Sequence, residues 1–271
     1  MCYTEAVATG NTAHLNSSDL VEAYRSGTSA YRLAKNAGVS IWAILKRLRE
    51  AGVTIRPDGV RKTLDLTSEG SQVFRELVDG LLLGDGSISR NKPSLRIEQS
   101  LVREGWLDDL QRRFSELGVK TGSTSIPQRT KIIEGRSVMK SPSRVMYLPL
   151  CDDVRAERSR WYPRNQKRVP RDLVLTPLTI ATWFCGDGTH DQQGFLYFCT
   201  NGFVRSDVQW LADQLSVFAE ARCVPVNAAR PGEYKIVITK RGQALALANI
   251  IRPYMPECCL YKLRFVRAPL V

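Results

Sequence analysis

The chain has 271 residues, is 43% hydrophobic and has a formal net charge of +12, from 39 Lys and Arg against 27 Asp and Glu. This apolar fraction excludes a disordered chain, and no run approaches the ~18 consecutive apolar residues of a membrane span. Seven scattered cysteines without a Cys-x-x-Cys pair and only two histidines argue against a disulfide framework or a zinc site. The cysteine usage favours a reducing cytoplasm, for a bacterial or phage-encoded protein. The basic balance favours nucleic acid as partner rather than a membrane.

Three short amphipathic helices are predicted within residues 1–56, the first candidate domain. Ser29 and Ser40 precede the second and third helices, and a serine hydroxyl at such a position caps the free N–H groups of the first turn. Gly38 supplies the turn between these two helices. The pattern resembles the helix-turn-helix of recombinases and small bacterial regulators, whose third helix enters the DNA major groove.

This resemblance implies DNA contacts from the third helix, over 41–51. The expected base contacts are Ser40 and Trp42, and the expected phosphate contacts are Lys46 and Arg47. The bulky Trp42 indole is an unusual base reader. A three-helix packing module, with Trp42 in the core or at an interface, is therefore the alternative.

One pattern occurs twice after a polar segment, containing Pro57-Asp58-Gly59, that predicts a linker over 57–70. Leu77–Gly86 and Ile180–Gly188 are apolar helical stretches that both end in Gly-Asp-Gly. Because an internal repeat sets the architecture, 71–172 and 173–271 are predicted to be two related halves. Small residues near both helix ends would let the two helices pack closely, namely Gly80, Gly84, Ala181 and Gly186.

Close packing of these helices would bring Asp85 and Asp187 together. Two adjacent carboxylates at the negative ends of two helix dipoles repel each other, and a divalent cation relieves that repulsion. Mg²⁺, or Mn²⁺ in its place, suits such a site because Mg²⁺ binds carboxylates while keeping positions for phosphate and water. One Gly-Asp-Gly alone favours a helix C-cap, but two copies at corresponding places favour a metal site.

Gly80–Gly86 matches the last seven residues of the LAGLIDADG signature, and Thr182–Gly188 matches it more loosely. The chain therefore resembles a single-chain, two-motif LAGLIDADG homing endonuclease. The resemblance implies an α+β fold in which two pseudo-symmetric αββαββα halves form a DNA-binding saddle, preceded by a small all-α helix-turn-helix domain. It also implies metal binding by Asp85 and Asp187 together with Gly84 and Gly186.

Two further segments resemble the family, Trp161–Pro170 as its linker and Tyr254–Leu263 as the end of the second half. The resemblance implies that one lysine in each, Lys167 and Lys262, is catalytic and lies near the metal. A cation there would stabilise negative charge that develops at the phosphate.

Period-two alternation predicts strands in 87–99, 119–150, 194–200 and 234–239, with helices over 106–117, 208–220 and 243–251. From Lys120 to Arg171 there are thirteen Lys and Arg against four Asp and Glu, which favours a phosphate-tracking surface over a solvated loop. Polar side chains on or beside these strands are candidate DNA contacts: Arg96, Gln99, Lys140, Arg144, Gln192, Thr200, Asn201, Arg230 and Lys235.

The resemblance implies a site-specific, intron-encoded type of double-strand DNA endonuclease, a monomer with internal pseudo-twofold symmetry. A non-catalytic transcription regulator on the same scaffold is one alternative, although both aspartates are retained. An RNA maturase for intron splicing is another, because the same basic surface could hold intron RNA.

Overall fold

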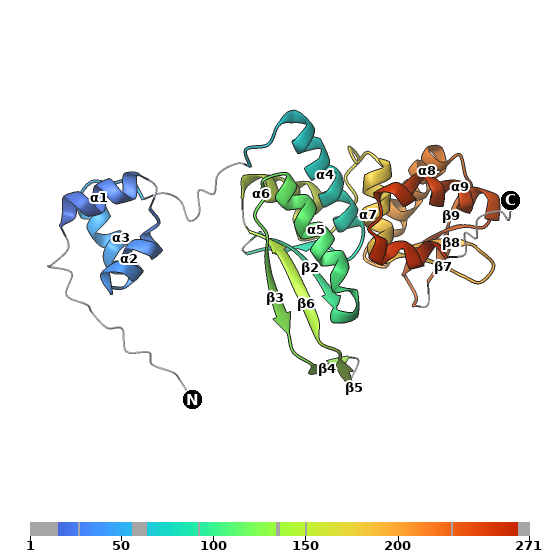
Figure 1. Ribbon diagram of the computed structural model, residues 1–271, viewed down its shortest axis with the longest axis horizontal. Coiled ribbons are helices and arrows are strands. Elements are labelled where there is room, and N and C mark those ends of the chain that lie inside the picture. The colour runs from blue at the N-terminus through green and yellow to red at the C-terminus, as the bar shows by residue number, and fades with distance from the viewer. Residues whose placement is uncertain are drawn as a thin grey trace. The chain divides into compact units, whose positions relative to one another are not determined.

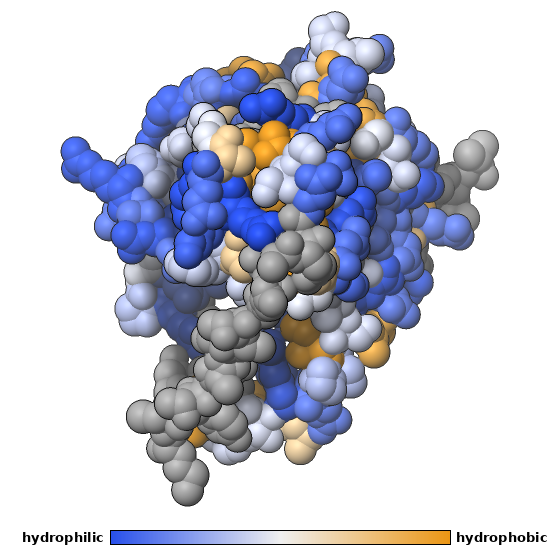
Figure 2. Space-filling view, turned by 90° about the vertical axis from the view of Figure 1, so that its left-hand side faces the viewer, coloured by the Kyte–Doolittle hydropathy of each residue, from blue (hydrophilic) through white to orange (hydrophobic). Residues whose placement is uncertain are grey.

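The computed structural model describes residues 16–26, 28–55, 64–91, 93–133, 136–149, 151–228 and 230–264. The chain divides into two compact units, Met1–Val60 and Arg61–Val271. Part of the predicted linker, residues 57–63, lies outside the described residues. Within the described ranges, no helix combines the length and apolar character needed to cross a bilayer. Hydrophilic side chains cover most of the face shown in Figure 2, with apolar ones in small separate areas.

The first unit contains three helices, α1 (Ser17–Arg25), α2 (Ala30–Ala37) and α3 (Ile41–Glu50). Ser29 Oγ accepts a hydrogen bond from the Arg32 N–H, and Ser40 Oγ accepts one from the Ala43 N–H, both at 3.2 Å. Both predicted N-caps are therefore confirmed. Gly38 adopts φ 65° in the turn, a left-handed conformation that glycine reaches without steric strain. The unit has its own small core of Leu20, Tyr24, Ala34, Ile44, Leu48 and Val53.

The two repeated helices lie side by side in the middle of the second unit (Figure 1), as α4 (Ser68–Leu83) and α7 (Pro177–Asp187). Thr67 caps helix α4, which begins at Ser68, so the predicted linker over 57–70 extended three residues into this helix. A Cβ atom on Gly80 would lie 2.6 Å from both Thr179 O and Thr182 Cβ. Gly80 of the first copy thus makes room for Thr182, which holds the equivalent position in the second copy.

Each half of the second unit contributes a four-stranded antiparallel sheet, and the strand order is the same in both. The first sheet has the order β1 (Ser87–Ile88), β2 (Leu95–Ser100), β6 (Ser143–Leu148), β3 (Gly122–Ile126). The second has the order β7 (Gly188–His190), β8 (Leu196–Cys199), β10 (Tyr234–Ile238), β9 (Cys223–Asn227). A separate ribbon of β4 (Arg129–Ile133) and β5 (Arg136–Lys140) lies between β3 and β6 in the chain. The predicted α+β class with two related halves is confirmed.

Helices pack on one side of both sheets, and a continuous apolar core joins the two halves. The remaining helices are α5 (Glu104–Glu116), α6 (Asp152–Trp161), α8 (Arg205–Ala219) and α9 (Arg241–Ile251), with short 3₁₀ turns η1 (Leu101–Arg103), η2 (Pro163–Asn165), η3 (Arg252–Tyr254) and η4 (Glu257–Leu263). The predicted halves 71–172 and 173–271 therefore share one compact unit.

Strand register decides which side chains face these helices, because directly opposite residues of an antiparallel pair point to the same side. In the first sheet Leu95 and Ile97 lie opposite Leu148 and Met146, and all four are buried under the helices. In the second, Leu196 and Phe198 lie opposite Ile238 and Ile236 in the same way. We call the other side of each sheet its open face.

Candidate active site

The ends of α4 and α7 bring the two motif aspartates together. A Cβ atom on Gly186 would lie 3.4 Å from Asp85 Oδ2, and one on Gly84 would lie 3.7 Å from the Asp187 nitrogen. The turn after α4 is held by the Gly86 N–H, which donates to Leu81 O at 2.7 Å. Asp85 and Asp187 are thus neighbours in space although 102 positions separate them in the chain.

The pair is electrostatically crowded. Burial, and then the charge of Asp85, raise the pKa of Asp187 to about 6, although Lys167 and Lys262 oppose this rise. A divalent cation between the carboxylates would remove the conflict. Among the described residues no three His, Cys, Asp or Glu side chains are grouped to hold a metal. The two carboxylates are a donor set that Mg²⁺ could take, because Mg²⁺ binds one or two carboxylates and keeps positions for water and phosphate.

A lysine contacts the main chain of each motif. Lys167 Nζ donates to Gly86 O at 3.1 Å, and burial lowers the pKa of Lys167 to about 8 even though Asp187 and Asp85 favour its charged form. Lys262 is buried and donates to Gly186 O at 2.7 Å and to Phe184 O at 3.2 Å. Burial lowers the pKa of Lys262 as well. Gly186 is one of the residues predicted to bind the metal. Its carbonyl oxygen already accepts a hydrogen bond from Lys262 and keeps a second lone pair.

The segment around Lys167 is tied to both halves. Before it, Tyr162 Oη accepts from the Ile88 N–H at 3.1 Å. After it, Arg168 Nε and Arg171 Nη2 donate to the buried carboxylate of Asp207 on α8 at 2.7 and 2.9 Å. These hydrogen bonds fix the backbone on both sides of Lys167, whose side chain contacts the first motif.

Gln99 was missed as part of this site. Its Nε2 donates to Asp85 Oδ2 at 2.6 Å, and its side chain is buried on the helix-facing side of β2. The sequence carried a signal for this placement. Gln99 follows Leu95 and Ile97 at a spacing of two residues, and alternate residues of a strand face the same side of the sheet. This placement corrects the prediction that Gln99 contacts DNA.

Two other predicted DNA contacts need the same correction. Arg144 lies opposite Gln99 on the helix-facing side, where Nη1 is 2.7 Å from Asp108 Oδ1 of α5. Thr200 is 1% exposed, and its hydroxyl donates to Tyr234 O at 2.6 Å. Neither side chain is presented for base contacts.

The remaining candidates of the second unit are at its surface. Arg96 is exposed on the open face of the first sheet, and Lys235 lies on that of the second, with Nζ 4.3 Å from the centroid of the Tyr197 ring. Lys140 is exposed on β5. The other three are exposed in turns of the second half: Gln192, Asn201 and Arg230.

In the first unit, Trp42 is 67% exposed, so it lies outside the core of this unit, and of the packing-module alternative only the version with Trp42 at an interface remains. Lys46 Nζ lies 5.7 Å from the centroid of the Trp42 ring and also pairs with Glu50. The Ser40 hydroxyl caps α3, and Arg47 is half-buried on the same helix. The start of α3 therefore presents an aromatic and basic surface.

A model of the LAGLIDADG DNA endonuclease family matches residues 75–240. The chain belongs to the LAGLIDADG DNA endonuclease family. It is 30% identical over 208 residues to the uncharacterized protein MJ1098 of Methanocaldococcus jannaschii, covering 74% of this chain and 76% of that relative. The homing endonuclease I-WcaI, solved bound to its DNA recognition sequence, has a TM-score of 0.59 at 19% identity and covers 79% of this chain and 97% of its own. I-DmoI in complex with DNA and Ca has a TM-score of 0.44 at 14% identity, covering 72% of this chain and 99% of its own.

The matched range of the LAGLIDADG family includes Asp85, Asp187, Gln99 and Lys167 but ends before Lys262. The position of Lys262 beside the second motif therefore rests on its hydrogen bonds to Gly186 and Phe184. The likeness to I-WcaI supports the predicted fold of two halves around paired helices.

Proposed function

We propose that this protein is a site-specific double-strand DNA endonuclease that hydrolyses phosphodiester bonds with Mg²⁺ or Mn²⁺. The observation that carries this proposal is the convergence of Asp85 and Asp187 at the ends of α4 and α7. Asp85 and Asp187 would hold the metal, with the main chain of Gly84 and Gly186 beside them. When bound, the metal supplies an activated water and stabilises the leaving 3′ oxygen.

The surrounding side chains have distinct roles in this proposal. Gln99 orients the Asp85 carboxylate through its hydrogen bond. Lys167 and Lys262 place a cation beside each motif, where negative charge develops at the scissile phosphate. With a lowered pKa of about 8, Lys167 also exchanges a proton readily near neutral pH.

Double-stranded DNA is the proposed partner, bound by a monomer whose two halves each engage one half-site. The net charge of +12 supports phosphate contacts and electrostatic steering. In the second unit the surface candidates are Arg96, Lys140, Gln192, Asn201, Arg230 and Lys235. In the first unit Trp42, Lys46, Arg47 and Ser40 would extend the contact, as the exposed start of α3 supports.

The test is cleavage of plasmid DNA by the full-length chain. Substrates carry either the sequence flanking its own reading frame or randomised inserts, with Mg²⁺ or with a chelator. We expect linear product only with Mg²⁺, and its loss in Asp85→Asn and in Asp187→Asn. Asp213→Asn, which alters an exposed carboxylate on α8, is the matched control and should cleave normally.

Gel shifts with the same duplexes decide between the alternatives. Sequence-specific DNA binding without cleavage in any divalent metal would favour the transcription regulator. Binding to intron RNA in preference to duplex DNA would favour the maturase.

A further inference from the structure

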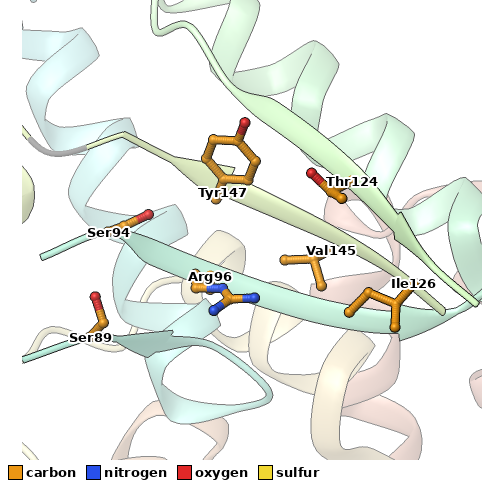
Figure 3. A pocket seen from close by; sticks show the side chains of 7 residues that line it. All are labelled: Ser89, Ser94, Arg96, Thr124, Ile126, Val145 and Tyr147. Atoms are coloured by element: carbon orange, nitrogen blue, oxygen red, sulfur yellow. The ribbon is translucent and has the colours of Figure 1, made fainter. Parts of the chain in front are cut away.

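The open face of the first sheet is rich in hydrogen-bonding groups. The register places Ser87, Arg96 and Tyr147 in one row across the strands, and Glu98, Val145 and Thr124 in the next. Figure 3 shows Arg96, Tyr147 and Thr124 around a cavity of about 390 Å³ on this face. The polar groups that line this cavity are a guanidinium and hydroxyls, and Ile126 and Val145 supply its apolar part.

The corresponding rows of the second sheet have a different chemistry. The first row is Thr189, Tyr197, Val237 and Val224, and the second is Cys199, Lys235 and Val226. Strand order and register are equivalent in the two halves, so Arg96 corresponds to Tyr197 and Thr124 corresponds to Val226. By the same register Val237 takes the place of Tyr147 and Lys235 takes the place of Val145, so the second open face carries more valines and fewer hydrogen-bonding groups than the first.

We propose that the two open faces read their half-sites differently: the second sheet recognises thymine C5-methyl groups in an A·T-rich half-site, and Arg96 of the first sheet recognises a guanine. This inference rests on the proposed binding of duplex DNA. Apolar side chains in the major groove contact the thymine methyl, whereas arginine pairs with guanine O6 and N7.

Two of the polar side chains on the second open face, Tyr197 and Lys235, already have partners within the protein, whereas Thr189 is exposed on β7. Tyr197 Oη donates to Asp191 Oδ2 at 2.8 Å, and Lys235 Nζ lies over the Tyr197 ring, 4.3 Å from its centroid. Val224 and Val226 are half-buried on β9, at the edge of the sheet. A base edge that met this surface would find the valine methyl groups and the Tyr197 ring, beside the Lys235 ammonium and the Thr189 hydroxyl.

Arg96 is in the opposite situation. It is exposed, and it forms no hydrogen bond or ion pair with any residue that the structure describes. Glu98, the acid nearest along the strand, instead accepts hydrogen bonds from Ser143 and Arg129. The fork of donors on Arg96 is thus available for a bidentate contact.

The test begins with selection of randomised duplexes by gel shift of the full-length chain in chelator, where no cleavage occurs. The selected site should have one half rich in A·T and the other with a preferred guanine. Deoxyuridine is then substituted for thymidine in one half-site at a time, which removes only the methyl group. Removal of each contacted methyl group should raise Kd about fourfold, the ratio that corresponds to ~0.8 kcal/mol.

Variants assign the half-sites to the sheets. The double variant Val224→Thr, Val226→Thr keeps the branched side-chain shape and replaces one methyl group by a hydroxyl at each position. The deoxyuridine penalty, meaning the ratio by which deoxyuridine raises Kd, should therefore fall toward one. Arg96→Ala should remove the guanine preference in the other half-site only. Arg96→Ala also serves as the control for the valine variant, because it should leave the deoxyuridine penalty unchanged.

The possible failures are distinguishable. If the chain binds no duplex, or binds only RNA, both the proposed function and this inference are lost. If it selects a specific duplex but deoxyuridine has equal or no effect in both half-sites, only this inference is overturned. If Arg96→Ala weakens all duplexes alike and lowers the salt slope by about one, Arg96 contacts phosphate, and its assignment to guanine fails.

Discussion

The crossing of α4 and α7 predicts a large effect of one methyl group at Gly80. In Gly80→Ala the new Cβ would lie 2.6 Å from Thr179 O and from Thr182 Cβ, and 3.0 Å from Thr182 Cγ2. The first of these atoms belongs to the backbone of α7, so relief requires the two helices to separate. This separation would also move Asp85 and Asp187 apart.

The size of the effect follows from two opposing terms. Overpacking a well-packed core costs about 1–3 kcal/mol, and two contacts this short place Gly80→Ala at the upper end. The higher helix propensity of alanine returns about 1 kcal/mol. The expected loss is therefore about 2 kcal/mol of unfolding free energy, or about 4–8 °C in Tm for a unit of this size.

Thermal and urea unfolding of the full-length chain measure this loss. Gly242→Ala is the control, since α9 leaves open space around Gly242 and its stability should be unchanged or slightly higher. In a double-mutant cycle, Thr182→Gly should rescue Gly80→Ala in part, because the clash with Thr179 O remains. A Gly80→Ala protein within about 0.5 kcal/mol of the parent would show that the helices do not cross this closely.

Three further predictions concern charged and polar groups of the second unit. Because burial and Asp85 raise the pKa of Asp187 to about 6, the folded metal-free protein holds a proton that the unfolded chain has released between about pH 4 and pH 6. Stability should fall as pH rises through that window, and urea unfolding of Asp187→Asn should lack this slope. Asp79→Ala should cost about 3 kcal/mol in urea unfolding, since it removes the buried partner of Arg160 and of the Trp161 indole N–H. Gln99→Ala should slow single-turnover cleavage about 10–100-fold while gel shifts show unchanged DNA affinity, because the hydrogen bond that orients Asp85 is lost.

The sequence predicted features that depend on neighbouring residues. Ser29 and Ser40 cap helices as expected, since a cap is decided within one turn. The repeated Gly-Asp-Gly predicted where two helices end and that they pair. These signals are short in range or occur twice, so no knowledge of tertiary packing was needed.

Side-chain direction on the strands was harder to predict. Shifting the register of a strand by one residue exchanges its two faces. The polar character of Arg96, Gln99 and Arg144 therefore did not show which of these side chains face the helices. The pairing of Asp79 with Arg160 joins α4 to α6 across 81 positions, and neither residue carries a local signal for it. Such contacts become visible only when the elements are packed.

The asymmetry of the two halves follows from their fusion in one chain. Gly80 and Thr182 hold the same place in the repeat and meet each other at the crossing of α4 and α7. In a symmetric dimer both partners would carry the same residue at such a contact, and two threonines would not fit where glycine already leaves no space. A single chain can instead keep a complementary pair. The same freedom extends to Gln99 and Thr200, which occupy equivalent register positions but hold Asp85 in one half and the Tyr234 carbonyl in the other. The two motif acids are alike and share one site, whereas the equivalent residues around them differ between the two halves.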